Sequence, residues 1–121
     1  MALHLDVSTN NNIAVVRCRG RIVFGDESDE LRRVILGLLK ETEGIVLNFA
    51  WVEVIDSCGV GVLVASLISA RNRGAEIKLA GLGPRVRHVL ATAKVDRLFE
   101  TYDSVDLAIK SFYAHPEAAA G

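Results

Sequence analysis

The sequence is poor in the residues that mark several specialised classes of protein. Its 121 residues include only two cysteines, Cys18 and Cys58, which can form neither a disulfide framework nor a four-ligand metal site. Fourteen basic and fifteen acidic residues give a net charge of −1, so no overall basic field attracts nucleic acid. We therefore expect no metal site and no direct contact with nucleic acid.

Long hydrophobic runs are also missing. The longest mainly apolar run, residues 60–70, contains two serines and a glycine and is too short to cross a bilayer. The first six residues lack the basic start and the apolar run of a signal peptide. These absences predict a reduced, cytoplasmic protein without a membrane partner. Half of the residues are hydrophobic, which is typical of a globular chain, and we expect one domain over residues 1–114 and a flexible tail over residues 115–121.

Hydrophobic periodicity predicts strands and helices in alternation. Residues 3–7 and 13–19 read as two strands joined by a short asparagine-rich turn, so they should be antiparallel. From residue 26 the apolar spacing becomes helical, and acidic residues in the first turns suit a helix N-terminus. Residues 44–49 are apolar at successive positions, as expected of a central strand that is covered on both faces.

The second half of the chain continues the same alternation. An apolar helix follows residue 59, and further elements are expected as a strand over residues 76–80, a helix from Pro84, a strand over residues 98–102 and a last helix capped by Asp103 or Ser104. A basic outer face on the Pro84 helix could bind phosphate, but solvation is the simpler interpretation for Arg85, Arg87 and His88. The order β-β-α-β-α-β-α-β-α predicts an α/β domain with a mixed, mainly parallel sheet and about four helices.

The most informative stretch is the polar elbow at residues 56–59, between the central strand and the apolar helix. Free backbone N–H groups and the helix dipole favour added negative charge at such a position. Ser57 could be a plain helix cap, or Asp56 could be the cap and leave Ser57 exposed for phosphorylation. Before the elbow, Trp51 and Val52 are expected in a loop, with Trp51 either exposed to a partner or packed under the loop.

Enzyme chemistry finds little support around the elbow. A nucleophile elbow has a glycine two residues before the serine and another two residues after it, and only Gly59 is present. Glycines at 59–61 and 81–83 complete neither a dinucleotide fingerprint nor a P-loop, so we expect no cofactor and no catalytic activity. Cys58 could be a reactive thiolate, but Asp56 opposes that, and we expect a small, partly buried filler.

Several stretches together resemble the signature of STAS domains, and more narrowly the stand-alone bacterial anti-sigma factor antagonists. They are residues 45–49, 54–63, 74–80, 95–99 and 104–108, and the resemblance that runs through them extends over nearly the whole chain. The element order derived from periodicity agrees with this resemblance. Cys58 stands where the family commonly has a second serine, and Arg21 to Val23 stand where an acidic residue often helps to bind the kinase.

The resemblance implies a phosphoprotein that regulates transcription by partner switching. Ser57 occupies the position that a partner phosphorylates, and that partner is both a serine kinase of the histidine-kinase-like ATPase type and an anti-sigma factor. Unphosphorylated protein would bind the kinase and release a sigma factor, and a phosphatase would reset the cycle. We expect a monomer or weak dimer, and we expect the partner contact to involve Asp56, Ser57, Cys58, Gly59, Val62, Arg21 and Val23.

Two other functions stay open at this point. One is a STAS scaffold that assembles with other STAS proteins or binds a small ligand without obligatory phosphorylation. The other is a hydrolase that uses Ser57 or Cys58 as a nucleophile.

Overall fold

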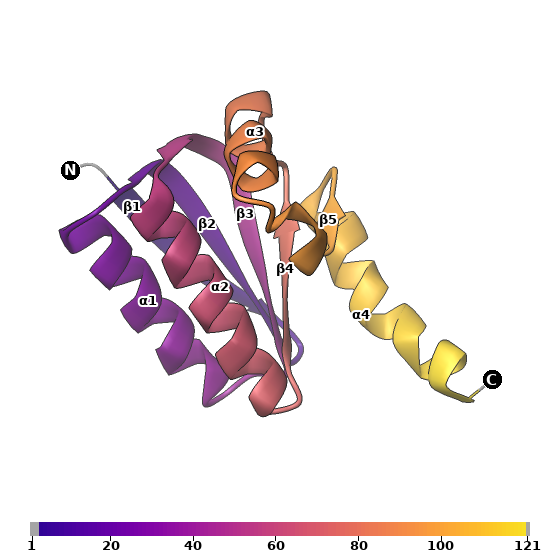
Figure 1. Cartoon of the computed structure of the whole chain (residues 1–121). Coiled ribbons are helices and arrows are strands. Elements are labelled where there is room, and N and C mark those ends of the chain that lie inside the picture. Colours follow the sequence, from indigo (N-terminus) through magenta and orange to yellow (C-terminus); the bar gives the residue numbers. More distant parts are fainter. Residues whose placement is uncertain (1–2, 121) are drawn as a thin grey trace.

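The computed structural model describes the backbone of residues 3–120 and the side chains of residues 3–113. Its centre is a five-stranded sheet in the order β1-β2-β3-β4-β5 (Figure 1). β1 is antiparallel to β2, and every other neighbouring pair is parallel, so the predicted mixed, mainly parallel sheet is confirmed. The strands are β1 (Leu3–Asn10), β2 (Ile13–Ile22), β3 (Gly44–Ile55), β4 (Glu76–Ala80) and β5 (Thr101–Tyr102).

Four helices cover this sheet, in the predicted order. In Figure 1, α1 and α2 lie side by side across one face of the strands, and α3 lies at the end where β3 leads into α2. A short 3₁₀ turn, η1 (Asp96–Leu98), precedes β5 and shortens the strand predicted there. The helices are α1 (Asp26–Leu39), α2 (Ser57–Asn72), α3 (Pro84–Thr92) and α4 (Val105–Ala120).

The two faces of the sheet hold separate apolar cores. The main core lies under α1, α2 and α3 and includes Ile45, Leu47 and Phe49 from β3. Val46 points the other way, into a smaller core under α4 that also contains Ala80. The prediction that residues 44–49 form a strand covered on both faces is therefore confirmed.

β3 continues to Ile55, well past the predicted end of the strand, and contains two bulges. Its register against β2 shifts opposite Arg17–Arg19 and again opposite Gly20–Arg21. Trp51 and Val52 therefore lie in a strand, and their predicted placement in a loop was wrong. Of the two alternatives for Trp51 the exposed one holds, since this side chain is 61% exposed.

α4 runs past the predicted domain boundary at residue 114, and the flexibility of residues 115–121 stays a prediction. Gly121 lies outside the described residues. Among the helices of the described chain, none combines the length and the apolar character that a bilayer crossing requires.

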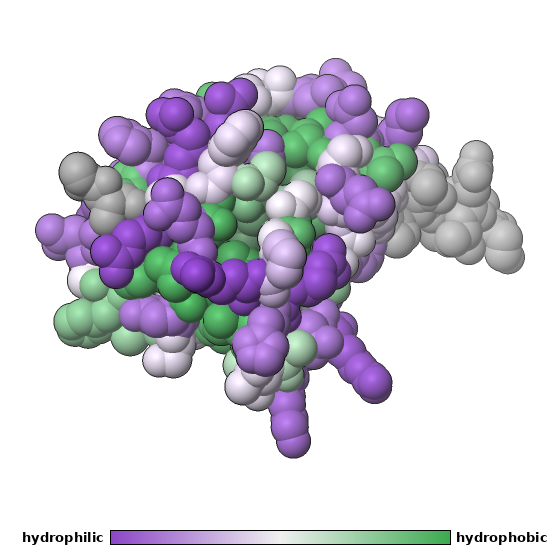
Figure 2. Space-filling view, turned by 90° about the horizontal axis from the view of Figure 1, so that it is seen from above, coloured by the Kyte–Doolittle hydropathy of each residue, from purple (hydrophilic) through white to green (hydrophobic). Residues whose placement is uncertain are grey.

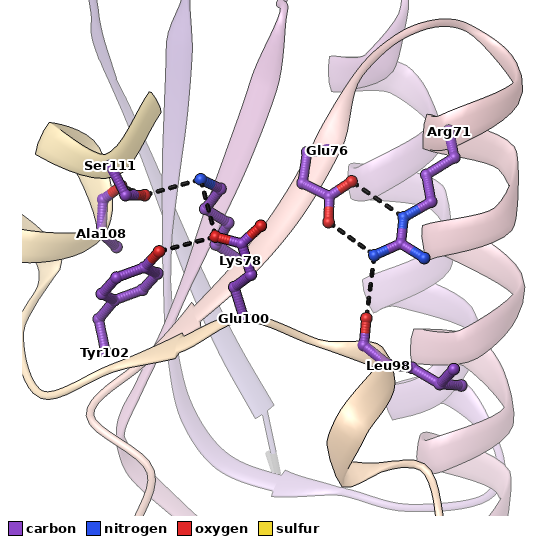
Figure 3. A network of polar contacts seen from close by, with 8 residues as sticks. All are labelled: Arg71, Glu76, Lys78, Leu98, Glu100, Tyr102, Ala108 and Ser111. Carbon is purple, nitrogen blue, oxygen red and sulfur yellow. Dashed lines mark hydrogen bonds and ion pairs between the residues drawn. The ribbon is translucent and has the colours of Figure 1, made fainter. Parts of the chain in front are cut away.

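A buried lysine holds α4 to the sheet (Figure 3). Lys78 of β4 has a fully buried side chain, and its Nζ donates to Ser111 Oγ of α4 at 2.7 Å. The same Nζ lies 3.1 Å from Glu100 Oε1 and 4.3 Å from the centre of the Phe112 ring. The Glu100 carboxylate, the Ser111 hydroxyl and the face of the Phe112 ring together replace the hydration that the buried ammonium group loses. Tyr102 adds a hydrogen bond from its hydroxyl to Glu100 Oε1 at 2.7 Å.

A second polar cluster fastens the far end of α2. The Arg71 guanidinium donates to Glu76 Oε1 at 2.9 Å and to Glu76 Oε2 at 2.8 Å, and also to the Leu98 carbonyl at 3.0 Å (Figure 3). These contacts join α2, β4 and the η1 turn. Hydrogen bonding to Glu76 raises the pKa of Arg71 above its already high ordinary value.

Candidate functional site

Asp56 organises the elbow between β3 and α2. It is the N-cap of α2, and its Oδ1 accepts a hydrogen bond from Gly59 N at 3.0 Å. Its Oδ2 accepts from Phe24 N at 2.9 Å, in the loop between β2 and α1. The Asp56 backbone N–H donates to the Ile22 carbonyl at 3.2 Å. One residue therefore fixes the start of α2 to the end of β2 and to the loop that follows it.

These hydrogen bonds also set the charge of Asp56. Desolvation by itself would raise the pKa of this carboxyl, but the backbone N–H groups of Gly59, Phe24 and Cys58 lower it, and the pKa ends below its ordinary value. Asp56 therefore carries a full negative charge at neutral pH. The surface around the elbow therefore includes one negative charge.

Replacing Asp56 with alanine should lower the free energy of unfolding by about 1–2 kcal/mol at neutral pH, because an N-cap is lost. The folded pKa of Asp56 lies below its unfolded value, so the charged cap stabilises fully above about pH 4. This stabilisation is lost as the pH falls through the folded pKa. Urea unfolding at several pH values should show the difference between wild type and Asp56→Ala shrinking in acid. Asp56→Asn keeps a capping oxygen without titrating, so its advantage over alanine should not change with pH.

Ser57 is exposed at the first position of α2 and is not the helix cap. Within the described part of the chain, no hydrogen bond engages its side chain. Of the two alternatives that the sequence left open, the second is found: Asp56 is the helix cap, and Ser57 is the next residue along the chain. Its hydroxyl is accessible beside the positive end of the helix dipole.

Two hollows flank the start of α2. Cys58 and Val62 line the first, of about 420 Å³, together with Phe24 and residues of α1. Ser57 and His88 line the second, of about 320 Å³, which lies against α3. Figure 2 looks down on this end of the molecule and shows apolar side chains near the middle of a hydrophilic surround. An apolar centre with a polar rim is the usual anatomy of a protein interface.

A thiol and an imidazole lie near Ser57. His88 shares a hollow with Ser57, but among the described residues no hydrogen bond joins their side chains, as a nucleophile and its base require. Cys58 is exposed, so the expectation of a partly buried filler was wrong. Its side chain sits on the helix surface because α2 buries Gly59 and Val60 instead. The other thiol, Cys18, is buried, and burial raises its pKa to about 12, so it stays protonated at neutral pH.

Gly59 lets the first turn of α2 lie directly against β2. A Cβ at this position would fall 2.5 Å from the Ile22 carbonyl oxygen and 2.8 Å from Ile55 Cγ1. No side chain fits between these atoms. A glycine here therefore lets the start of α2, with Asp56 and Ser57, lie close to the C-terminal ends of β2 and β3. Gly59 itself is buried and contributes through packing.

The predicted contact residues do not all lie together. Ser57 and Cys58 are exposed at the start of α2, where Asp56 and Val62 are half-buried. Val23 is half-buried in the loop whose next residue, Phe24, is bonded to Asp56. Arg21 is separate, because Ile22 packs in the main core and its neighbour on the strand therefore points to the opposite face of the sheet.

Phe24 belongs to this site, although the sequence did not single it out. Its side chain is 76% exposed and lines the hollow beside Cys58, while its backbone is held by Asp56. The sequence feature that could have indicated it is a large aromatic residue directly before a glycine and the acidic start of a helix. Water is a poor environment for such a ring, which makes it a good anchor for a partner.

Comparison with known proteins identifies the fold. The family model of the STAS domain matches residues 4–108. The anti-sigma factor antagonist SpoIIAA in its unphosphorylated form superposes with a TM-score of 0.77 at 19% identity, over 93% of this chain and 97% of that chain. An anti-sigma factor antagonist from Mycobacterium paratuberculosis superposes with a TM-score of 0.78 at 19% identity, over 91% of this chain and 93% of that chain. A sulfate transporter family protein from Wolinella succinogenes superposes with a TM-score of 0.73 at 20% identity, over 91% of this chain and 92% of that chain. With its family model matched over most of its length, this chain belongs to the STAS domain family.

Proposed function

We propose that this chain is a cytoplasmic anti-sigma factor antagonist, that it binds a serine-kinase anti-sigma factor of the histidine-kinase-like ATPase type, and that phosphorylation of Ser57 ends the binding. The observation that carries the proposal is the division of roles at the elbow. Asp56 caps α2 and leaves the Ser57 hydroxyl exposed, so a kinase can modify it without removing a hydrogen bond on which the fold depends. Two structural neighbours are described as anti-sigma factor antagonists, and SpoIIAA has also been solved in a phosphorylated form.

The surface around Ser57 suits a contact that is made only without phosphate. Exposed Phe24 and the two hollows offer apolar area to a partner. Ser57 lines one hollow, and its neighbour Cys58 lines the other. A partner packed there would exclude water from the serine. Because aromatic side chains in such positions carry much of the binding energy, Phe24 is the anchor of this contact.

Phosphate would act on binding far more than on folding. It adds about −1.5 to −2 charge beside the charge of Asp56. The N-terminus of α2 favours this charge, and its first turn carries no acidic residue besides the cap, so the fold tolerates it. Binding of a partner over Ser57 would instead require the phosphate to lose its hydration, and the phosphate would repel any carboxylates on the partner surface. The modification chemistry belongs to the kinase, and the phosphatase that resets Ser57 is a separate protein.

The test combines the protein with a candidate kinase of this type and Mg-ATP, followed by intact-mass and binding measurements. Wild type should gain one phosphate, and Ser57→Ala should gain none. Ser57→Asp should bind the kinase at least about tenfold more weakly than Ser57→Ala, because its carboxylate brings a negative charge into the contact. A tenfold change in affinity corresponds to about 1.4 kcal/mol. Cys58→Ser is the matched control: it adds a second hydroxyl on the next residue and should still gain one phosphate only.

Phosphorylation at a site other than Ser57, or equal kinase binding by Ser57→Ala and Ser57→Asp, would contradict the switch. The alternative would then be a STAS scaffold or small-ligand module that needs no phosphorylation. The apolar lining of the α3 hollow, with Val60, Val89 and Ala93, is the feature that such a ligand would use.

A further inference from the structure

The sheet face under α4 is only partly covered by that helix. α4 packs over β3, β4 and β5 and over the start of β2 at Ile13 and Val15, and α1 and α2 lie on the other face. On this side, no described helix packs against the part of β2 that follows Val15 or against the strand β1 beside it. On β2, buried Cys18 and Ile22 point into the main core. The residues that alternate with them, Arg17, Arg19 and Arg21, are exposed on the uncovered face.

An aromatic residue and a hollow accompany this row of arginines. Trp51 of β3 lies in register with Arg19, and Asn48 lies in register with Arg17. Trp51 is the only tryptophan of the chain and is largely exposed. A hollow of about 480 Å³ adjoins the row and is lined by Asp6, Val7, Ser8, Val15, Arg17, Asn48 and Val105.

The polar groups on this face are mostly unused hydrogen-bond donors. Among the described residues, Arg17, Arg19 and Arg21 make no ion pair and no side-chain hydrogen bond. Asp6 faces Arg17 in register, yet no ion pair joins the two side chains in the described structure. Asn48 Oδ1 already accepts from Ala50 N at 3.1 Å, which leaves the amide NH₂ of Asn48 as a donor. An acceptor-rich, negatively charged partner fits such a face.

We propose that this face, formed by Arg17, Arg19, Arg21, Asn48 and Trp51, docks an extended acidic segment of a partner protein. Alternate residues of a strand repeat about every 6.6 Å, and carboxylates at alternate positions of an extended segment repeat at the same interval. Guanidinium groups bind carboxylates in a planar, two-bonded geometry, and Trp51 supplies an aromatic anchor. Asp6 beside the row and the net charge of −1 favour a short acidic segment over a long polyanion such as nucleic acid.

This docking surface is separate from the Ser57 contact. Ser57 begins α2, which covers the opposite face of the sheet, so both contacts can be made at the same time. The inference therefore does not depend on whether Ser57 is phosphorylated.

The test uses the emission of Trp51, which reports only on this face. The probe is a short synthetic peptide in which aspartate alternates with threonine, and the control peptide has asparagine in place of aspartate. The aspartate peptide should change the emission to saturation, with an affinity that falls as salt is added, and the asparagine peptide should not. The double variant Arg17→Gln, Arg19→Gln should bind at least about tenfold more weakly. Arg85→Gln with Arg87→Gln removes the same charge from α3 and should leave the affinity unchanged.

Three results would overturn the proposal. The first is an emission that does not respond to the aspartate peptide. The second is an equal loss of affinity in the two double variants, which would reduce the effect to net charge. The third is tighter binding of a single-stranded oligothymidylate than of the peptide, which would assign the face to nucleic acid.

Discussion

Replacing Gly59 with alanine is expected to lower the free energy of unfolding by about 3 kcal/mol, at the upper end of the cost of overpacking. The added methyl group would fall 2.5 Å from the Ile22 carbonyl oxygen, which belongs to the backbone and cannot turn aside. α2 would have to move away from β2, and the hydrogen bond from Asp56 N to that same carbonyl would lengthen or break. Chemical denaturation of the purified variant measures the loss.

Gly61→Ala is the matched control two residues along the same helix. A Cβ at position 61 has no neighbour within 4 Å, so the methyl group fits. Alanine is the better helix former, and this variant should be more stable than wild type by about 0.5–1 kcal/mol. Equal stability of the two variants would contradict the close packing of α2 against β2.

Lys78→Ala is the second large effect that we expect, with a loss of about 3 kcal/mol. The substitution removes a fully buried four-carbon stem between β4 and α4 and leaves a cavity. It also removes the ammonium that bonds Ser111 and Glu100. Urea unfolding should show the loss.

Lys78→Met separates the stem from the charge. Methionine keeps most of the volume, and burying it costs no ion desolvation, so this variant should stay within about 1 kcal/mol of wild type. The groups left behind keep other partners: Ser111 donates to the Ala108 carbonyl at 2.6 Å, and Glu100 is 41% exposed to water. A loss as large as that of Lys78→Ala would show that the ammonium, not the stem, holds α4.

Local periodicity was sufficient for the order of elements, because the apolar spacing of each segment reflects the face that it buries. It was not sufficient for the end of β3. Phe49, Val52 and Ile55 face the main core at intervals of three residues, which matches neither a regular strand nor a helix, and the sequence therefore suggested a loop. Lys78 shows a second limit. Its alternation within a strand was correctly read, but its burial depends on α4, which comes 27 or more residues later in the chain.

The site was only partly visible in the sequence. The elbow motif pointed to Asp56 and Ser57, but which of them caps α2 depends on where the backbone turns, and adjacent residues with capping side chains cannot be distinguished by type. Phe24 was missed because an aromatic residue near a strand end is usually buried. Its backbone is held by a hydrogen bond to Asp56, a contact between segments 32 residues apart that local periodicity does not reveal.

The bulges of β3 also determine where related chains can differ in length. In a regular strand, the gain or loss of one residue moves every following side chain to the other face. At a bulge two neighbouring residues share a face, so one can be lost while the inward positions stay inward. Residues 50–51 and 53–54 can therefore absorb a deletion with Asp56 still turned toward the end of β2. The same deletion within residues 45–48 would invert the strand that leads to the elbow, so length variation in this part of the family should concentrate at the bulges.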